Sequence, residues 1–410
     1  ADLLQKILER CQKYSIFLIE INKMSTQFIY TSIVLVVFIL TQILSLSTSI
    51  RLKEGSIIKK KFSTTLFYLS FFVLCFFVCF TDSGADYINY YQGIENETTL
   101  TGVWNMEDGE PLFAFWSYLG MKIFNNAHVV IFSMKAVALL LIFRTFYILR
   151  LYIDIPLAIF AYVALLYFDS MYLISIHLAT AFEFYAFALL VLGHNKKSFF
   201  FYILAIGLHF SSVVSILTYM ICLILVDREK VCLYKMRALI VFFGGIILLS
   251  SSFFLIEYLI FVVPAFSRYA IYLFDADSNN SGIFQYFIYF PPIIALYYLF
   301  FKEKEKTLYK YYSLVFTGVG FSIAMIAYHL PILTRVYFHY SIVFILFLPY
   351  AINQIKISSV IVPRKKILIS FSKVFLTIYF AFRLFLTLET KLDPMHTSEL
   401  LYYRFFIPFS

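Results

Sequence analysis

Residues 199–226 read FFFYILAIGLHFSSVVSILTYMICLILV, an apolar run of 28 residues. Basic segments flank this run on both sides, HNKK at 194–197 and REKVCLYKMR at 228–237. Cytoplasmic loops of membrane proteins carry an excess of Lys and Arg, and a single span here would place one of these segments outside. Two half-length helices that enter and return on the same side would keep both inside. Such a broken hairpin is tolerated where protein or a water-filled cavity satisfies its backbone, so we expect one here, with a single span as the alternative.

The composition of the whole chain agrees with a membrane setting. The 410 residues are 62% hydrophobic and 14% charged, with a mean hydropathy of +0.84. A soluble domain has about 45–50% apolar and about 25% charged residues. We expect an all-α polytopic integral membrane protein with about 10–12 transmembrane helices and re-entrant half-helices. The runs long enough to span lie at 27–48, 63–81, 126–147, 155–174, 176–193, 239–264, 284–301, 310–329, 333–353 and 367–388.

The charges predict which loops lie on which side. The net charge is +9, but Lys and Arg lie in short loops between apolar runs, so we expect no nucleic-acid partner. The segment 81–110 instead carries seven acids and no Lys or Arg. This places 82–125, 264–284 and 389–410 on the outer face of one multi-span domain, 24–410. Segment 111–124 is too short to span and is expected at the interface. Residues 1–23 are amphipathic, an upstream extension or an appended remnant, and receive no function.

Acids and tyrosines gather in the outer stretch TDSGADYINYYQGI, residues 81–94. Asp86 and Glu110 flank segments that enter the membrane and are candidates for a general base. Tyrosines have an apolar face and a hydroxyl, so they suit a sugar surface as well as an interfacial belt. The acids at positions 95, 97, 107 and 108 are expected to be ordinary solvated loop residues.

Histidines and outer-side arginines complete the candidates. His209 lies near the expected tip of the hairpin, where it could meet a substrate that enters from outside, whereas His339 is expected to be structural. Arg335 lies just inside the start of a span, and Arg268 lies in a facing outer loop. Arg binds phosphate through a planar fork of N–H donors. The alternative, non-catalytic role for these arginines is snorkelling toward lipid headgroups.

The sequence lacks the motifs that nucleotide hydrolysis and metal-dependent catalysis usually require. The chain has no Walker motif, no HExxH and no Cys/His spacing typical of a metal site. The nearest match to an acidic nucleotide-sugar motif, DAD at 275–277, lies in a Ser/Asn-rich stretch typical of a loop. We therefore expect no metal and no cofactor.

Five short motifs resemble, in order, the EpsG-like branch of the bacterial Wzy-type polysaccharide (O-antigen) polymerases. They are ADYINYY at 85–91, EPLF at 110–113, LHFSSVVSIL at 208–217, TRVYFHYSIVFILFLPY at 334–350 and YYRFFIP at 402–408. The resemblance implies a GT-C-like membrane glycosyltransferase in the bacterial inner membrane, with its site facing the periplasm. It would join undecaprenyl-diphosphate-linked glycans as donor and acceptor, among membrane lipids. A flippase and a chain-length regulator of the same pathway are possible partners.

The resemblance also implies roles for individual residues. Asp86, Glu110 or His209 would be the base, and Arg335 with Arg268 would clamp the diphosphate. The groove for sugar and diphosphate would be completed by Tyr87, Tyr90, Tyr91, Tyr403 and Arg404.

The chain departs from the family pattern in one place. The family commonly has an Arg-Gln pair where this chain reads SIHLATAFEF at 175–184, which gives His177 and Leu178. Either His177 supplies the positive contact when protonated, or Arg268 has taken over that role. Two other functions stay open. One is an O-antigen ligase, although such ligases usually show one very long outer loop. The other is a flippase or transporter of lipid-linked oligosaccharides, although the ionisable residues cluster on the outer side.

Overall fold

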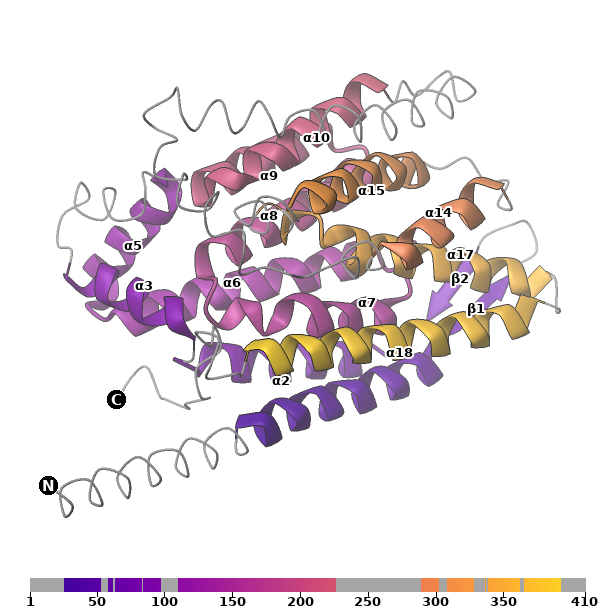
Figure 1. Ribbon diagram of the computed structural model, residues 1–410, viewed down its shortest axis with the longest axis horizontal. Coiled ribbons are helices and arrows are strands. Elements are labelled where there is room, and N and C mark those ends of the chain that lie inside the picture. Colours follow the sequence, from indigo (N-terminus) through magenta and orange to yellow (C-terminus); the bar gives the residue numbers. More distant parts are fainter. Residues whose placement is uncertain are drawn as a thin grey trace, which may run out of the picture.

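The computed structural model describes residues 26–52, 58–61, 63–82, 84–96, 110–225, 289–301, 308–327, 336, 338–361 and 365–391. This part of the chain is a bundle of roughly aligned helices (Figure 1), with one antiparallel pair of short strands. The strands are β1 (Ser49–Leu52) and β2 (Ile58–Lys61), and Ser49 pairs with Lys61. The predicted span 239–264, the outer segment 264–284 and residues 1–23 lie outside the described residues, as does most of 389–410.

Among the described residues, four helices are long and apolar enough to cross a membrane. They are Thr26–Ser47, α6 (Ala127–Ile148), α8 (Ile174–Val191) and the stretch Ile367–Leu388 of α18 (Lys365–Lys391). The structure therefore confirms a helical, polytopic membrane protein, while the total of 10–12 spans and the GT-C-like architecture stay predictions. The described part of the chain also contains the α-helices α2 (Thr64–Cys79), α3 (Ala85–Asn96), α5 (Pro111–Phe124), α7 (Ile155–Tyr162), α9 (Asn195–Leu208), α10 (Val213–Leu225), α14 (Phe290–Phe301), α15 (Leu308–Ala327) and α17 (Leu348–Ile361).

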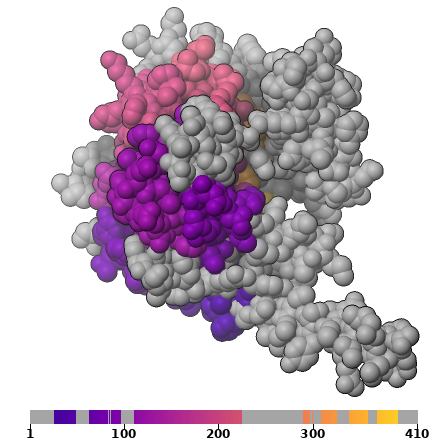
Figure 2. Space-filling model, turned by 90° about the vertical axis from the view of Figure 1, so that its left-hand side faces the viewer, coloured from indigo at the N-terminus to yellow at the C-terminus, as the bar shows by residue number. Residues whose placement is uncertain are grey.

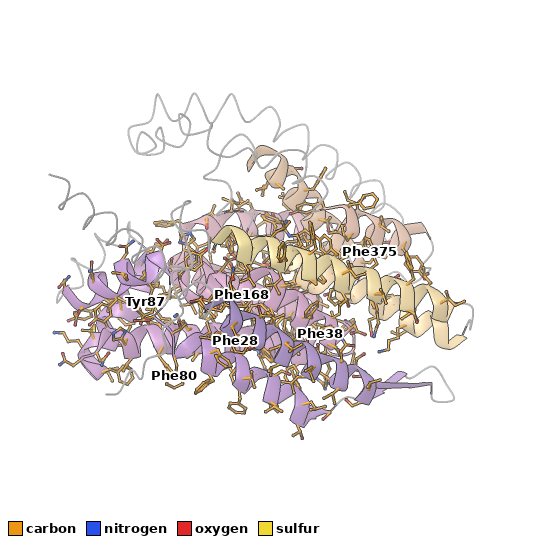
Figure 3. All side chains as sticks on the ribbon, turned by 60° about the horizontal axis from the view of Figure 1, so that its bottom comes forward. Phe28, Phe38, Phe80, Tyr87, Phe168 and Phe375 are labelled. Atoms are coloured by element: carbon orange, nitrogen blue, oxygen red, sulfur yellow. The ribbon has the colours of Figure 1, made fainter. Side chains whose placement is uncertain are left out.

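Helix α8 lies at the centre of the bundle. Its apolar stretch is 89% buried, and it packs against both α6 and α9. The helix Thr26–Ser47 and α18 are only 28% and 17% buried over their apolar stretches, so they form the outside of the bundle. Phe28 and Phe375 on these two outer helices (Figure 3) are 73% and 41% exposed. An apolar exposed surface of this kind is suited to lipid.

Residues 195–225 form the expected hairpin. Helix α9 ends at Leu208, the next residue His209 has an extended backbone (φ −159°, ψ 121°), and a short turn, Phe210–Ser212, leads into α10. Tyr219 of α10 donates a hydrogen bond to the carbonyl of Asn195, 3.1 Å away at the start of α9. The rings of Tyr202 and Tyr219 also lie 4.8 Å apart. The structure thus shows the 14-residue helix α9 and the return of the chain after it, and α10 is described as far as Leu225. That both helices are half-length and re-enter on one side stays a prediction.

The segment before α3 needs a glycine. Gly84 has a φ of +111°, which side chains rarely adopt, and a Cβ there would lie 2.1 Å from Cβ of Tyr172. Glycine alone permits both the conformation and the close approach. It sets α3 against Tyr172, two residues before α8 begins.

Candidate active site at the tip of the helical hairpin

Glu110 and His209 come together from segments 99 residues apart. Glu110 is the extended residue before α5, a position that the following Pro111 favours. Its Oε1 contacts Nδ1 of His209 at the hairpin turn, and the two side chains are 8% and 16% exposed. The structure thus joins two of the predicted base candidates into one acid–histidine pair, partly accessible at the tip.

Tyr90 is connected to this pair through a serine. The hydroxyl of Ser175, near the start of α8, lies 3.3 Å from Nδ1 of His209 and 3.0 Å from Oη of Tyr90. Helices α3, α5 and α8 and the hairpin therefore each contribute one polar side chain. Figure 2 views the end of the molecule where α3, α5 and the hairpin lie. Ser175 was not among the predicted residues, because a serine in an apolar run gives no distinctive signal.

Tyr87 and Tyr91 form a separate group with His128 of α6. Oη of Tyr87 lies 2.6 Å from Nδ1 of His128, and the ring of Tyr91 stacks on His128 at 4.2 Å. Burial, with a smaller contribution from Asp82, raises the pKa of Tyr87, so its hydroxyl stays protonated and can donate this hydrogen bond. Asp86 is half-buried in the first turn of α3, where a carboxylate also stabilises the helix dipole.

A lysine inside a predicted span was missed. Lys135 of α6 is 3% exposed, and its Nζ donates to the carbonyl of Thr81 at 3.0 Å. The same Nζ lies 4.7 Å from the centre of the Tyr87 ring. A cation in the run 126–147 was itself the available signal, because charges at that depth are rare and generally paired.

A second acid–histidine pair lies beside the first. Oε2 of Glu183 in α8 is 3.0 Å from Nδ1 of His339, and Nε2 of His339 is 2.5 Å from Oγ of Ser211 at the hairpin turn. The rings of His209 and His339 stack with centres 6.3 Å apart. Glu183 was missed although it interrupts the run 176–193, and His339 was expected to be merely structural.

One of the remaining candidates, His177, does not join this arrangement. His177 is buried, and its Nε2 lies 3.1 Å from Oη of Tyr162. Because residues two apart on a helix point about 200° apart, His177 faces away from Ser175 and the hairpin tip. The predicted residues Arg268, Arg335, Tyr403 and Arg404 lie outside the described residues.

The helices and the buried ionisable pairs define a polytopic membrane protein with a polar site between its helices. The family model described as EpsG family matches residues 64–404, and the chain belongs to this family. EpsG-like proteins are members of the Wzy-type polysaccharide polymerases, so the resemblance drawn from the short motifs is confirmed. No curated protein and no solved structure matches the chain.

Proposed function

We propose that the protein polymerises undecaprenyl-diphosphate-linked oligosaccharide repeat units on the periplasmic face of the bacterial inner membrane. A hydroxyl of one lipid-linked glycan attacks the anomeric carbon of another, and undecaprenyl diphosphate leaves. Membership of the EpsG family supports the reaction class. The observation that carries the site assignment is the contact between Glu110 and His209, which come from two of the family-like motifs.

The Glu110–His209 pair suits the removal of the hydroxyl proton. Oε1 of Glu110 accepts the hydrogen of Nδ1–H, which fixes the tautomer and leaves Nε2 of His209 as the proton acceptor. When that proton arrives, the carboxylate stabilises the imidazolium. General-base catalysis of this kind contributes about 10²–10⁴-fold. Asp86 is the competing base, because it lies on the same helix as Tyr90.

The other tasks fall to the tyrosines and arginines. Tyr90 is hydrogen-bonded into the site through Ser175 and is the tyrosine best placed to hold a sugar beside His209. Tyr91 would extend that surface along α3, while the buried Tyr87 would hold His128 beneath it. Arg335 and Arg268 would stabilise the leaving diphosphate, as preorganised positive charges do in phosphate chemistry. Tyr403, Arg404 and His177 stay secondary candidates for the same groove.

Transport of lipid-linked oligosaccharide is a second candidate, favoured by specific observations. Transporters use broken helices and ionisable residues near the midplane of the membrane. Lys135 and Glu183 are buried within helices able to span, and the α9–α10 hairpin is broken at His209. The expectation that ionisable residues cluster on the outer side is therefore incomplete.

Deleting the gene and separating the cell's glycolipids on a gel tests the proposal. A polymerase predicts a ladder that collapses to one repeat unit on its lipid carrier. Complete polymer that stays on its carrier indicates a ligase, and accumulation of repeat units at the cytoplasmic face indicates a flippase. Either of these two outcomes contradicts the proposed reaction.

A further inference from the structure

Glu183 is a buried carboxylate in the middle of a central helix. It is 2% exposed, and its Oε2 accepts hydrogen bonds from Nδ1 of His339 and Oγ of Ser215, both at 3.0 Å. Its other oxygen, Oε1, has no hydrogen-bond partner among the described residues. An incompletely satisfied buried charge generally lowers stability relative to an apolar residue. Its presence in α8 therefore calls for a role other than stability.

Within the described part of the chain, the two hydrogen bonds that Glu183 accepts connect it to the hairpin, one directly to α10 and one through His339 to the turn. His339 binds Ser211 at the turn, and Ser215 of α10 binds Glu183 directly. One turn further along α10, Oγ1 of Thr218 lies 2.5 Å from Oη of Tyr340, the residue after His339. A row of hydroxyls on α10 is thus fastened to α8 and to residues 339–340.

The arrangement is directional. With Oε2 of Glu183 accepting from Nδ1–H, Nε2 of His339 presents a lone pair, and the hydroxyl of Ser211 donates to it. Ser211 lies two residues after His209, whose extended backbone falls outside both helices. The position of the His209 ring therefore depends on the hydrogen bond that holds the turn at Ser211, as well as on helix packing.

We propose that Glu183 and His339 are positioning residues, which fasten the hairpin turn through Ser211 so that His209 meets Glu110. This inference rests on the proposed function, in which His209 removes the proton of the acceptor hydroxyl. Glu183 and His339 would hold His209 in the position that this step requires. Neither residue touches the substrate. The buried pair selects one arrangement of the turn, a use of buried ionic groups that trades stability for specificity.

The test measures the position of His209 without requiring activity. Glu110→Cys and His209→Cys are combined in a full-length chain whose five native cysteines are alanine. Disulfide formation on mild oxidation in native membranes is quantified by mass spectrometry of the joined peptides. Adding Glu183→Leu or Ser211→Ala should lower the yield several-fold, and Ser211→Thr should restore it. Thr180→Val is the matched control, because it removes a hydroxyl 3.5 Å from Nδ1 of His339 and leaves the Glu183–His339 pair intact.

Activity is measured separately, with Glu110 and His209 intact. Glu183→Leu and Ser211→Ala should reduce polymer by roughly ten- to a hundredfold, the effect of moving a reacting group by about 1 Å. Ser211→Ala keeps the test valid if Glu183→Leu fails to fold. Unchanged cross-linking in Ser211→Ala overturns the inference, whatever happens to polymer. Cross-linking that falls while polymer persists in His209→Gln supports the positioning role and instead overturns the assignment of His209 as the base.

Discussion

Two histidines whose rings lie side by side near the hairpin turn, His209 and His339, have different surroundings. His209 is partly exposed and pairs with Glu110, the residue before α5, whereas the side chain of His339 is fully buried and pairs with Glu183. A partly exposed imidazole can exchange protons with a substrate, and a buried one can hold a fixed hydrogen bond. The difference in exposure is the reason for assigning chemistry to the first and positioning to the second.

Replacing either member of the exposed pair tests its chemical role. Glu110→Gln and His209→Gln should each reduce polymer by about 10²-fold or more, because the oriented base is lost. Single repeat units should then accumulate on the lipid carrier, visible on a glycolipid gel. Glu95→Gln, an exposed acid of α3, is the control and should leave the ladder unchanged. A normal ladder in both Glu110 and His209 variants would exclude this pair as the base.

Arg335 precedes His339 by four positions in the sequence and is the predicted clamp for the diphosphate. Arg335→Ala should abolish polymer and leave single repeat units on lipid. Arg335→Lys should restore little, because an ammonium lacks the planar fork that binds phosphate through two hydrogen bonds. Arg150→Ala, in a predicted inner loop, is the matched control. Full-length chains made by Arg335→Ala at unchanged protein levels would remove Arg335 from the site.

Among the elements, α3 depends on a single glycine. Gly84→Ala would place a methyl group 2.1 Å from Cβ of Tyr172 in a backbone conformation that alanine rarely adopts. We expect a loss of about 1–3 kcal/mol in stability and a shortened polymer, since α3 carries Tyr90. A thermal shift of the purified protein and the glycolipid ladder measure these effects. The exposed Asn89→Ala on α3 should change neither, and a wild-type melting temperature for Gly84→Ala would contradict the expected strain.

The hairpin makes a prediction about sidedness. Single cysteines at Lys196 and Lys230 should both be blocked only by membrane-permeant reagents, because both flanking segments are expected in the cytoplasm. A cysteine at Phe210, which is 49% exposed at the turn, should react from the outer side. If one flank reacts with an impermeant reagent from outside, the hairpin enters differently and the assignment of faces must be reversed or replaced.

Hydropathy and charge patterns in the sequence predicted where the helices lie, but not which side chains contact one another. Apolar runs and loop charges predicted the spans and a break near His209, and the family-like motifs picked out Glu110 as a candidate. The contact between Glu110 and His209 was not predicted, because the two residues were alternatives for the same role. Nor was Glu183 predicted, because α8 is apolar and buried on all sides and gives no amphipathic pattern. Its partner His339 is 156 residues away, and the rotation of each helix about its axis brings them together. A single sequence does not specify that rotation.

In the whole molecule, the site and the opposite end of the bundle are held by different interactions. Asp154 caps α7, and its Oδ2 lies 3.4 Å from Lys356 and 3.7 Å from Lys373. Lys373 also reaches Ser45 of the first helix at 3.2 Å. These contacts connect α7, α17, α18 and the first helix at the end that the loop charges predict to face the cytoplasm.

Asp154→Asn tests whether that end affects stability alone. Asn can still cap α7, so the substitution removes the charge and leaves the cap. Because both lysines are partly exposed, we expect a loss of roughly 1–3 kcal/mol, with the amount of polymer per folded molecule unchanged. Thermal melting and ladder length normalised to protein level measure the two effects. A specific loss of polymer at normal stability would show that the two ends are coupled.

The length of the hairpin has a consequence for where the reaction would occur. Helix α9 has 14 residues, which at a rise of about 1.5 Å per residue gives roughly 21 Å, whereas the hydrocarbon layer is about 30 Å thick. A hairpin that starts at the cytoplasmic boundary would stop roughly 9 Å short of the outer one. His209 and Glu110 would then lie at the bottom of a depression in the bilayer. Sugars attached to a lipid at the surface would have to descend into it together with water. Chain elongation would therefore depend on bilayer thickness as well as on the residues at the tip.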